Sequence, residues 1–225
     1  MRRRQHLDHR VRAGLLTLVL LHGIGTGPGA WKPQLDALDA IAPDLVPAYR
    51  RGFEAAVEEV SSLLQPGAEL CGLSLGGLVA LKVAERVEPS RLVVCAAFDR
   101  LPSGLRVRTR ALALATRVVP TSFLHKQLVA ELPEPYRAIA LEEIAPLRSA
   151  ELSRLMWQAA GSVVDPTSIA VPAIVACGER DKANLPLART LAEKLPNGRL
   201  ELVPEAGHVA NVDNPEAFTT LIGSR

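Results

Sequence analysis

The chain has 225 residues, of which 48% are hydrophobic and 22% are charged, and its mean hydropathy is +0.15. This composition supports a large buried core and excludes an intrinsically disordered protein. A chain of this length needs no disulfide bond or structural metal in order to fold. The formal net charge is only +2, and no aromatic residues are interleaved among the basic ones, which argues against a nucleic-acid partner.

The chain begins with an arginine-rich segment, which we expect to be a mobile basic leader over residues 1–14. No cleavage site follows it, so we do not expect a secretory signal. Three cysteines, Cys71, Cys95 and Cys177, lie far apart inside apolar runs, unlike a disulfide framework, and we therefore expect a cytoplasmic protein. The longest wholly apolar run covers the nine residues 169–177, far fewer than the ~18 of a membrane span, so we expect no membrane partner.

Short apolar segments alternate with segments of helical periodicity, which predicts a parallel sheet covered by helices. The predicted strands are residues 15–21, 45–48, 69–73, 91–97, 173–177 and 199–204. The predicted helices are residues 31–38, 52–64, 76–87 and 186–195, and a last short one that opens at Asn214-Pro215. We expect an α/β fold with a doubly wound, mostly parallel sheet of about six strands.

One long segment interrupts this alternation. Between residues 98 and 168 the sequence predicts no strand, only helical pattern that is cut by prolines. In an open α/β sheet, an insertion after the carboxyl end of a strand lies where ligands bind. We therefore predict a helical lid at residues 99–168, inserted into a core made of residues 15–98 and 169–225. Its candidate substrate-binding side chains are Phe98, Phe123 and Trp157.

The pentapeptide Gly72-Leu73-Ser74-Leu75-Gly76 follows a predicted strand and opens a predicted helix. In that context a G-x-S-x-G sequence forms a nucleophile elbow. The sharp turn strains the backbone of the serine and leaves no room for a Cβ atom at the flanking positions, which explains the two glycines. Ser74 is therefore the candidate nucleophile.

Two further residues follow later predicted strands. Asp181 lies four residues after the fifth strand, and His208 lies just after the last one. A serine hydroxyl is a weak nucleophile until an imidazole accepts its proton, and the imidazole needs a carboxylate to fix its tautomer. The chain order of serine, acid and histidine predicts a triad of Ser74, Asp181 and His208.

An oxyanion formed at the attacked carbonyl needs two backbone N–H donors. The candidates are Leu75, at the positive end of its predicted helix, and Ile24, in the loop after the first strand. Glycines at alternate positions of residues 23–29 allow that loop to curl towards the nucleophile.

The same loop also matches a dinucleotide-binding fingerprint, G-x-G-x-x-A, at residues 25–30. The match starts several residues beyond the strand, and Pro28 removes an N–H that would face a phosphate. Arg50 and Arg51 stand where an NAD site has its ribose-binding acid. An NAD(P)-dependent reductase is therefore the weakest alternative, and we expect no cofactor. The scattered cysteines and the lack of a His-Glu-x-x-His sequence predict no metal.

These residues give the chain a resemblance to the α/β-hydrolase superfamily, in its compact branch of esterases, lactonases, C–C bond hydrolases and cofactor-free peroxidases. The resemblance runs from about residue 15 to the C-terminus without the lid, and it includes the His22-Gly23 loop and residues 207–215. It implies a role for each residue that matches a family motif. Ser74 is the nucleophile, Asp181 the acid and His208 the base, with Ile24 and Leu75 as oxyanion donors.

The chain departs from the family pattern in two places. The family sheet usually begins with two antiparallel strands, but only about 14 residues precede the first predicted strand here, so we expect a sheet without them. Asp99 lies just after the fourth predicted strand, a place from which some family members recruit their acid. It is the alternative to Asp181.

The expected function is that of a serine hydrolase that cleaves a small ester, lactone or thioester through an acyl-enzyme. A lyase, decarboxylase or cofactor-free peroxidase step with the same residues is an alternative within the superfamily. A non-catalytic binder of small molecules is an alternative of another class. In each case the expected partner is a small molecule.

Overall fold

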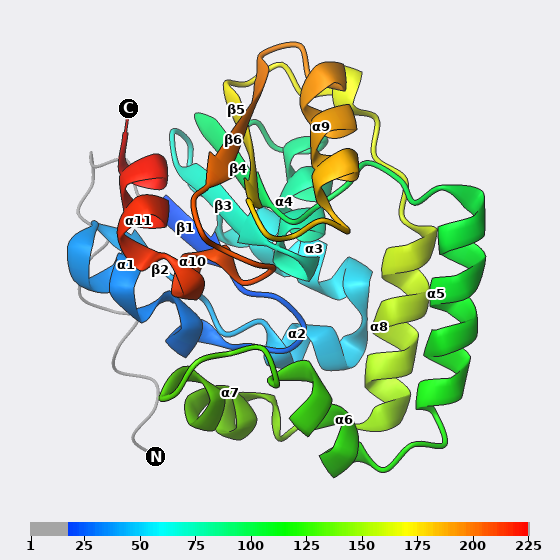
Figure 1. Cartoon of the computed structure of the whole chain (residues 1–225). Coiled ribbons are helices and arrows are strands. Elements are labelled where there is room, and N and C mark those ends of the chain that lie inside the picture. Colours follow the sequence, from blue (N-terminus) through cyan, green and yellow to red (C-terminus); the bar gives the residue numbers. More distant parts are fainter. Residues whose placement is uncertain (1–17, 225) are drawn as a thin grey trace.

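A computed structural model describes residues 18–224 and is built around a six-stranded parallel sheet (Figure 1). The strands are β1 (Leu18–Leu21), β2 (Ala40–Ile41), β3 (Glu69–Leu73), β4 (Arg91–Cys95), β5 (Ala173–Gly178) and β6 (Gly198–Val203). They lie in the order β2-β1-β3-β4-β5-β6, so the sheet grows from β1 in both directions. This is the doubly wound arrangement that the sequence predicts. The predicted leader at residues 1–14 lies outside the described residues.

The helices lie between the strands and after the last one. They are η1 (Pro28–Trp31), α1 (Lys32–Ala37), α2 (Val46–Arg51), α3 (Phe53–Leu63), α4 (Leu75–Ala84), α5 (Ser103–Thr116), α6 (Thr121–Leu128), α7 (Tyr136–Ile144), α8 (Ser149–Gly161), η2 (Pro166–Ser168), α9 (Leu185–Lys194), α10 (Ala210–Asp213) and α11 (Pro215–Gly223). The predicted helices correspond to α1, α3, α4, α9 and α11. None of the helices in the described range is long and apolar enough to cross a lipid bilayer.

Most of the predicted strands are confirmed. Those at residues 69–73, 91–97, 173–177 and 199–204 are β3 to β6, and the described part of the first one is β1. The predicted strand at residues 45–48 is wrong, because this apolar run enters α2. Pro47 lies in the first turn of that helix, where its fixed φ is favourable and no hydrogen bond is lost. The edge strand is instead β2, two half-buried residues that pair with β1.

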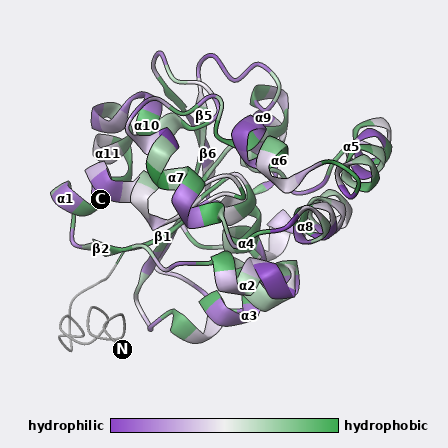
Figure 2. Ribbon diagram, turned by 90° about the horizontal axis from the view of Figure 1, so that it is seen from below, coloured by the Kyte–Doolittle hydropathy of each residue, from purple (hydrophilic) through white to green (hydrophobic). Residues whose placement is uncertain are grey.

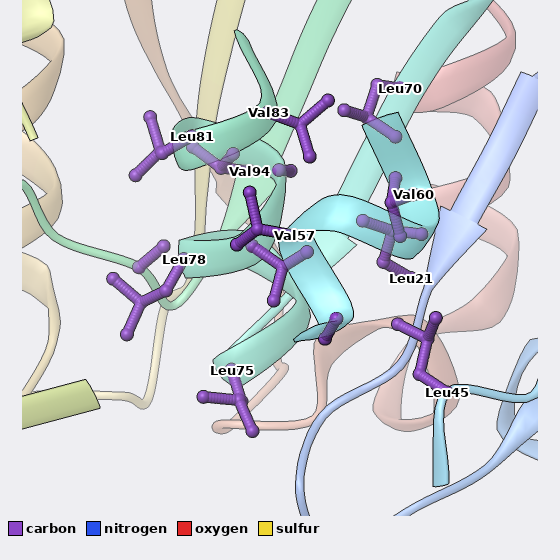
Figure 3. Close-up of a cluster of buried hydrophobic side chains, with 14 of the residues drawn as sticks. Leu21, Leu45, Val57, Val60, Leu70, Leu75, Leu78, Leu81, Val83 and Val94 are labelled. Carbon is purple, nitrogen blue, oxygen red and sulfur yellow. The ribbon is translucent and has the colours of Figure 1, made fainter. Parts of the chain in front are cut away.

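Side chains of the central strands alternate between two hydrophobic clusters, one on each face of the sheet. In β5, Val175 and Cys177 belong to one cluster, and Ile174 and Ala176 to the other. The first cluster is covered by α2, α3, α4 and α9, and Figure 3 shows part of it. The second is covered by α1, α10 and α11. Because both faces are buried, the strands read as continuous apolar runs in the sequence.

The chain between β4 and β5 holds the four α-helices α5 to α8, which we call the helical insertion, and the short η2. The sequence predicts helices and no strand in this segment. In Figures 1 and 2, α5 and α8 lie side by side at one edge of the molecule, where they pack against each other. Figure 2 shows hydrophobic and hydrophilic residues mixed along α5. The division of the chain into core and lid at residues 99 and 168 remains a prediction.

The loop after β1 is held by His22, which is fully buried. Its Nε2 accepts the Leu45 N–H at 3.0 Å, so the ring proton is assigned to Nδ1, which donates to Gly23 O at 2.9 Å. Tyr49 donates its hydroxyl to His22 O at 2.7 Å. Burial lowers the pKa of His22, because the charged imidazolium would lose its hydration. The neutral ring therefore fixes the direction in which the loop leaves the sheet.

We expect stability to fall as the pH drops below 6.5, the ordinary pKa of histidine. In that range the unfolded chain binds a proton at His22 that the folded chain does not. The free energy of unfolding therefore falls by up to about 1.4 kcal/mol for each unit by which the pH is lowered. Urea unfolding of the wild type and of His22→Gln at pH 7 and pH 5 measures this. The variant should show a shallower pH dependence, whereas parallel curves would contradict the burial of a neutral ring.

The second cluster depends on Phe218, which is fully buried and lies 5.9 Å from the Trp31 ring between centroids. We expect Phe218→Ala to lower the free energy of unfolding by about 3–5 kcal/mol, because it leaves a cavity under α11. Phe123→Ala is the matched control, since Phe123 is 54% exposed, and should change stability by less than about 0.5 kcal/mol. Similar urea midpoints for the two variants would contradict this packing.

Candidate active site

Ser74 lies in a tight turn between β3 and α4. Its φ of 55° and ψ of −117° are strained for a residue with a side chain. A Cβ atom at Gly72 would stand 2.3 Å from Gly76 O, and one at Gly76 would stand 2.3 Å from Leu21 O. The backbones of the turn and of β1 therefore approach so closely that only glycine fits on either side of the serine.

A chain of hydrogen bonds joins Ser74 to His208 and Asp181. The distance from Ser74 Oγ to His208 Nε2 is 3.1 Å, and that from His208 Nδ1 to Asp181 Oδ2 is 3.0 Å. The three residues follow β3, β5 and β6, whose carboxyl ends meet at one edge of the sheet. A Cβ atom at Gly178 would lie only 2.0 Å from Gly207 O, so the loops after β5 and β6 are pressed together. The structure thus brings together the three residues that the sequence singled out.

Asp181 is buried and has a second partner, Asn184, which the sequence pattern does not predict. Asn184 Nδ2 donates to both oxygens of the carboxylate, at 3.0 and 2.8 Å, and its backbone N–H donates to Oδ1 at 3.2 Å. Burial alone would raise the pKa of Asp181, but the hydrogen bonds from His208 and Asn184 outweigh it and hold the pKa below its ordinary value. The only sequence signal was the asparagine just before α9, at its N-cap position.

The alternative acid, Asp99, has a different environment. It is buried, and its Oδ2 accepts a hydrogen bond from Lys194 Nζ on α9 at 2.7 Å. Arg100 Nε lies 3.5 Å from the same oxygen. Among the described residues, the carboxylate hydrogen-bonded to His208 is that of Asp181. Asp99 therefore serves as the counter-ion of two basic side chains.

The two predicted oxyanion donors lie beside Ser74. Leu75 is the first residue of α4, and the first amides of a helix have no acceptor within it. Ile24 and Leu75 line the same cavity as Ser74 and His208. A Cβ atom at Gly23 would stand 3.9 Å from Ser74 Oγ, so the loop after β1 passes next to the hydroxyl.

A cavity of about 350 Å³ opens beside Ser74 and His208. Its walls come from α4, from α5 and α8 of the helical insertion, and from the loops after β4 and β5. Phe98 lines it, as predicted. Phe123 and Trp157 do not: both are exposed, and the Trp157 ring instead lies 4.7 Å from the guanidinium of Arg110. Aliphatic side chains of the insertion, such as Leu105 and Leu155, line the cavity in place of these two aromatic residues.

The loop at residues 25–30 is packed in a way that opposes a dinucleotide phosphate. Gly29 donates its N–H to Glu143 Oε1 on α7 at 2.7 Å, so a carboxylate already stands at the amide a phosphate would need. Arg50 and Arg51, which stand where an NAD site has its ribose-binding acid, are both in ion pairs. Arg50 pairs with Glu151 at 3.2 Å, and Arg51 with Glu59 at 2.7 Å.

The cysteines offer no second nucleophile. Cys71, Cys95 and Cys177 are free and buried in the sheet. Burial raises the pKa of Cys71 to about 12 and that of Cys177 to about 11, so both thiols are protonated at neutral pH. Within residues 18–224, no three histidine, cysteine, aspartate or glutamate side chains gather closely enough to hold a metal ion.

The chain is similar to known proteins of one family. Residues 18–221 match the model of the Alpha/beta hydrolase family. The chain is 29% identical, over 247 aligned residues, to pimeloyl-[acyl-carrier protein] methyl ester esterase of Aromatoleum aromaticum, and the match covers 91% of this chain and 96% of that protein.

Two solved structures show the same fold. A thermophilic esterase from Thermogutta terrifontis has a TM-score of 0.77 at 21% identity, covering 93% of this chain and 88% of the other. MenH from S. aureus has a TM-score of 0.76 at 19% identity, covering 92% and 91%. Because the family match spans nearly all of the described residues, the chain belongs to the alpha/beta hydrolase family.

Proposed function

We propose that the protein is a serine hydrolase that cleaves a small ester, lactone or thioester through an acyl-enzyme. The observation that carries the proposal is the hydrogen-bonded chain from Ser74 through His208 to Asp181 at the wall of a cavity. The relative named as a methyl ester esterase supports the same reaction class.

In the first half of the reaction, Ser74 Oγ attacks the carbonyl carbon while His208 Nε2 accepts its proton. Asp181 accepts a hydrogen bond from Nδ1–H and stabilises the imidazolium. The backbone N–H groups of Ile24 and Leu75 stabilise the oxyanion; the loss of one such donor typically costs about 3 kcal/mol in the transition state. The intermediate collapses when the imidazolium gives its proton to the leaving alcohol or thiol, which leaves the acyl group on Ser74.

In the second half, His208 Nε2 accepts a proton from water, and the resulting hydroxide attacks the acyl carbonyl. The acid leaves as Ser74 Oγ takes the proton back. Asn184 contributes indirectly, because its bonds to both carboxylate oxygens orient Asp181 towards the imidazole.

Two alternatives use the same site: a lyase-type reaction and a non-catalytic binder. A lyase or synthase reading draws on a second relative, named as a putative 2-succinyl-6-hydroxy-2,4-cyclohexadiene-1-carboxylate synthase of Bacillus subtilis, which is 35% identical over only 54 residues. A non-catalytic binder would use the cavity alone and turn over no ester.

A cytoplasmic location is also proposed, supported by three free cysteines.

We expect Ser74→Ala to lower kcat/KM for p-nitrophenyl acetate by at least about 10³-fold, because no other group replaces the attacking oxygen. Ser62→Ala, an exposed serine on α3, is the control and should keep full activity. The assay follows the release of p-nitrophenolate. Turnover that persists unchanged in Ser74→Ala would end the assignment of the nucleophile.

Replacing the acid should separate the two candidates. We expect Asp181→Asn to lower kcat by up to about 10⁴-fold, because the asparagine amide favours the wrong tautomer of His208. Asp99→Asn removes an ion pair with Lys194 and should lower kcat by less than about 10-fold. A large loss in Asp99→Asn together with an active Asp181→Asn would transfer the role to Asp99.

A further inference from the structure

We propose that the cavity beside Ser74 selects esters with an uncharged aliphatic arm of medium length and rejects esters whose arm ends in a carboxylate. This inference rests on the proposed function and adds the substrate class to it. It comes from the chemistry of the cavity walls, not from the reacting residues.

The walls of the cavity are almost wholly apolar. Apart from Ser74 and His208, the polar side chains that line it are Thr109 of α5 and Asn184, and Asn184 is engaged with Asp181. The remaining lining residues are aliphatic or aromatic except for the thioether of Met156, and no lysine, arginine, aspartate or glutamate is among them. Such walls favour transfer of a hydrocarbon chain out of water.

The basic residues of α5 do not reach into this space. Thr109 lines the cavity, but its neighbours Arg108 and Arg110 do not. Arg108 is exposed, and Arg110 stacks over Trp157. A carboxylate carried into the cavity would lose its hydration and meet no cation, which is strongly unfavourable.

The size of the cavity sets the length of the arm. Its volume of about 350 Å³ is roughly twelve times the share of one water molecule in the liquid. This volume lies near the lower end of the roughly 300–1,000 Å³ of ligand pockets, so it holds an arm of medium length and not a long acyl chain. Each buried methylene adds about 0.8 kcal/mol, which corresponds to about a four-fold gain in kcat/KM until the cavity is full.

Two ester series test the length and tell which side of the ester fills the cavity. One series varies the acyl chain of p-nitrophenyl esters from acetate to laurate, and the other varies the alcohol of alkyl acetates from methyl to octyl. We expect kcat/KM to rise about four-fold per methylene in one series and then to level off or fall. Hydrolysis of every ester with no dependence on length in either series would overturn the inference but leave the proposed function standing. Hydrolysis of none would overturn the proposed function itself.

A matched pair of substrates tests the charge. Methyl hexanoate and monomethyl adipate have the same chain, but the adipate ends in a carboxylate. We expect kcat/KM to be at least about a hundred-fold lower for the adipate, measured by acid release in a pH-stat. If the length series place the alcohol in the cavity, hexyl acetate and 6-acetoxyhexanoate form the corresponding pair. Equal rates within the pair on the side that fills the cavity would overturn the proposal.

Two arginine variants on α5 test whether the discrimination against a carboxylate arises at the wall of the cavity. Thr109→Arg puts a cation at the cavity wall, and Ala111→Arg puts one on the exposed side of the same helix. We expect Thr109→Arg to raise the adipate-to-hexanoate ratio of kcat/KM by at least about ten-fold, and Ala111→Arg to leave it unchanged. The urea midpoint of each variant shows that it is folded. The same ratio in active Thr109→Arg as in the wild type would overturn the assignment of this cavity.

Discussion

The turn between β3 and α4 is the constraint on which the arrangement of the site depends. Ser74 holds a positive φ, a conformation that costs of order 1–3 kcal/mol and persists only where the surroundings impose it. Here β3 lies inside the sheet between β1 and β4, and α4 is packed against it. Close contacts of Gly72 and Gly76 with neighbouring backbone restrict the conformation of the turn. In that conformation the Ser74 hydroxyl lies within hydrogen-bond distance of His208.

The edge of the sheet at the carboxyl ends of the strands orients the remaining groups, and α7 of the insertion also holds the loop after β1, because Glu143 accepts the Gly29 N–H. Parallel strands end side by side, so the loops after β1, β3, β5 and β6 meet above that edge. A buried neutral His22 fixes the first loop, and the close approach of Gly178 to Gly207 fixes the last two. The reacting groups therefore belong to the sheet, whereas α5 and α8 of the insertion supply apolar wall to the cavity.

The sequence predicts the features that depend on local pattern. β-branched and leucine-rich runs identify five strands, and the glycines around Ser74 identify the turn, because each signal lies within a few residues. The missing strand, β2, is two half-buried residues at the edge and has no such pattern. The apolar run that begins at Leu45 resembles a strand, yet it enters a helix because Pro47 suits a first helical turn.

Features that depend on distant contacts could not be predicted in this way. In the sequence, Asn184 is only a polar residue before a predicted helix. In the folded chain its side chain contacts both Asp181 and His208. Phe123 and Trp157 are aromatic residues in a predicted lid, but their direction depends on how α5, α6 and α8 pack. Composition indicates that the insertion has apolar residues, whereas only the three-dimensional packing shows that aliphatic ones face the cavity.

The central claim is that His208 and Asp181 activate the Ser74 hydroxyl. Reaction of the folded protein with a fluorophosphonate, followed by peptide mass spectrometry, tests it most directly, because the reagent phosphonylates only a serine whose proton a neighbouring base removes. We expect one adduct per chain, on Ser74, and no adduct in His208→Ala. No adduct on the folded wild type, or an adduct on another residue, would contradict it.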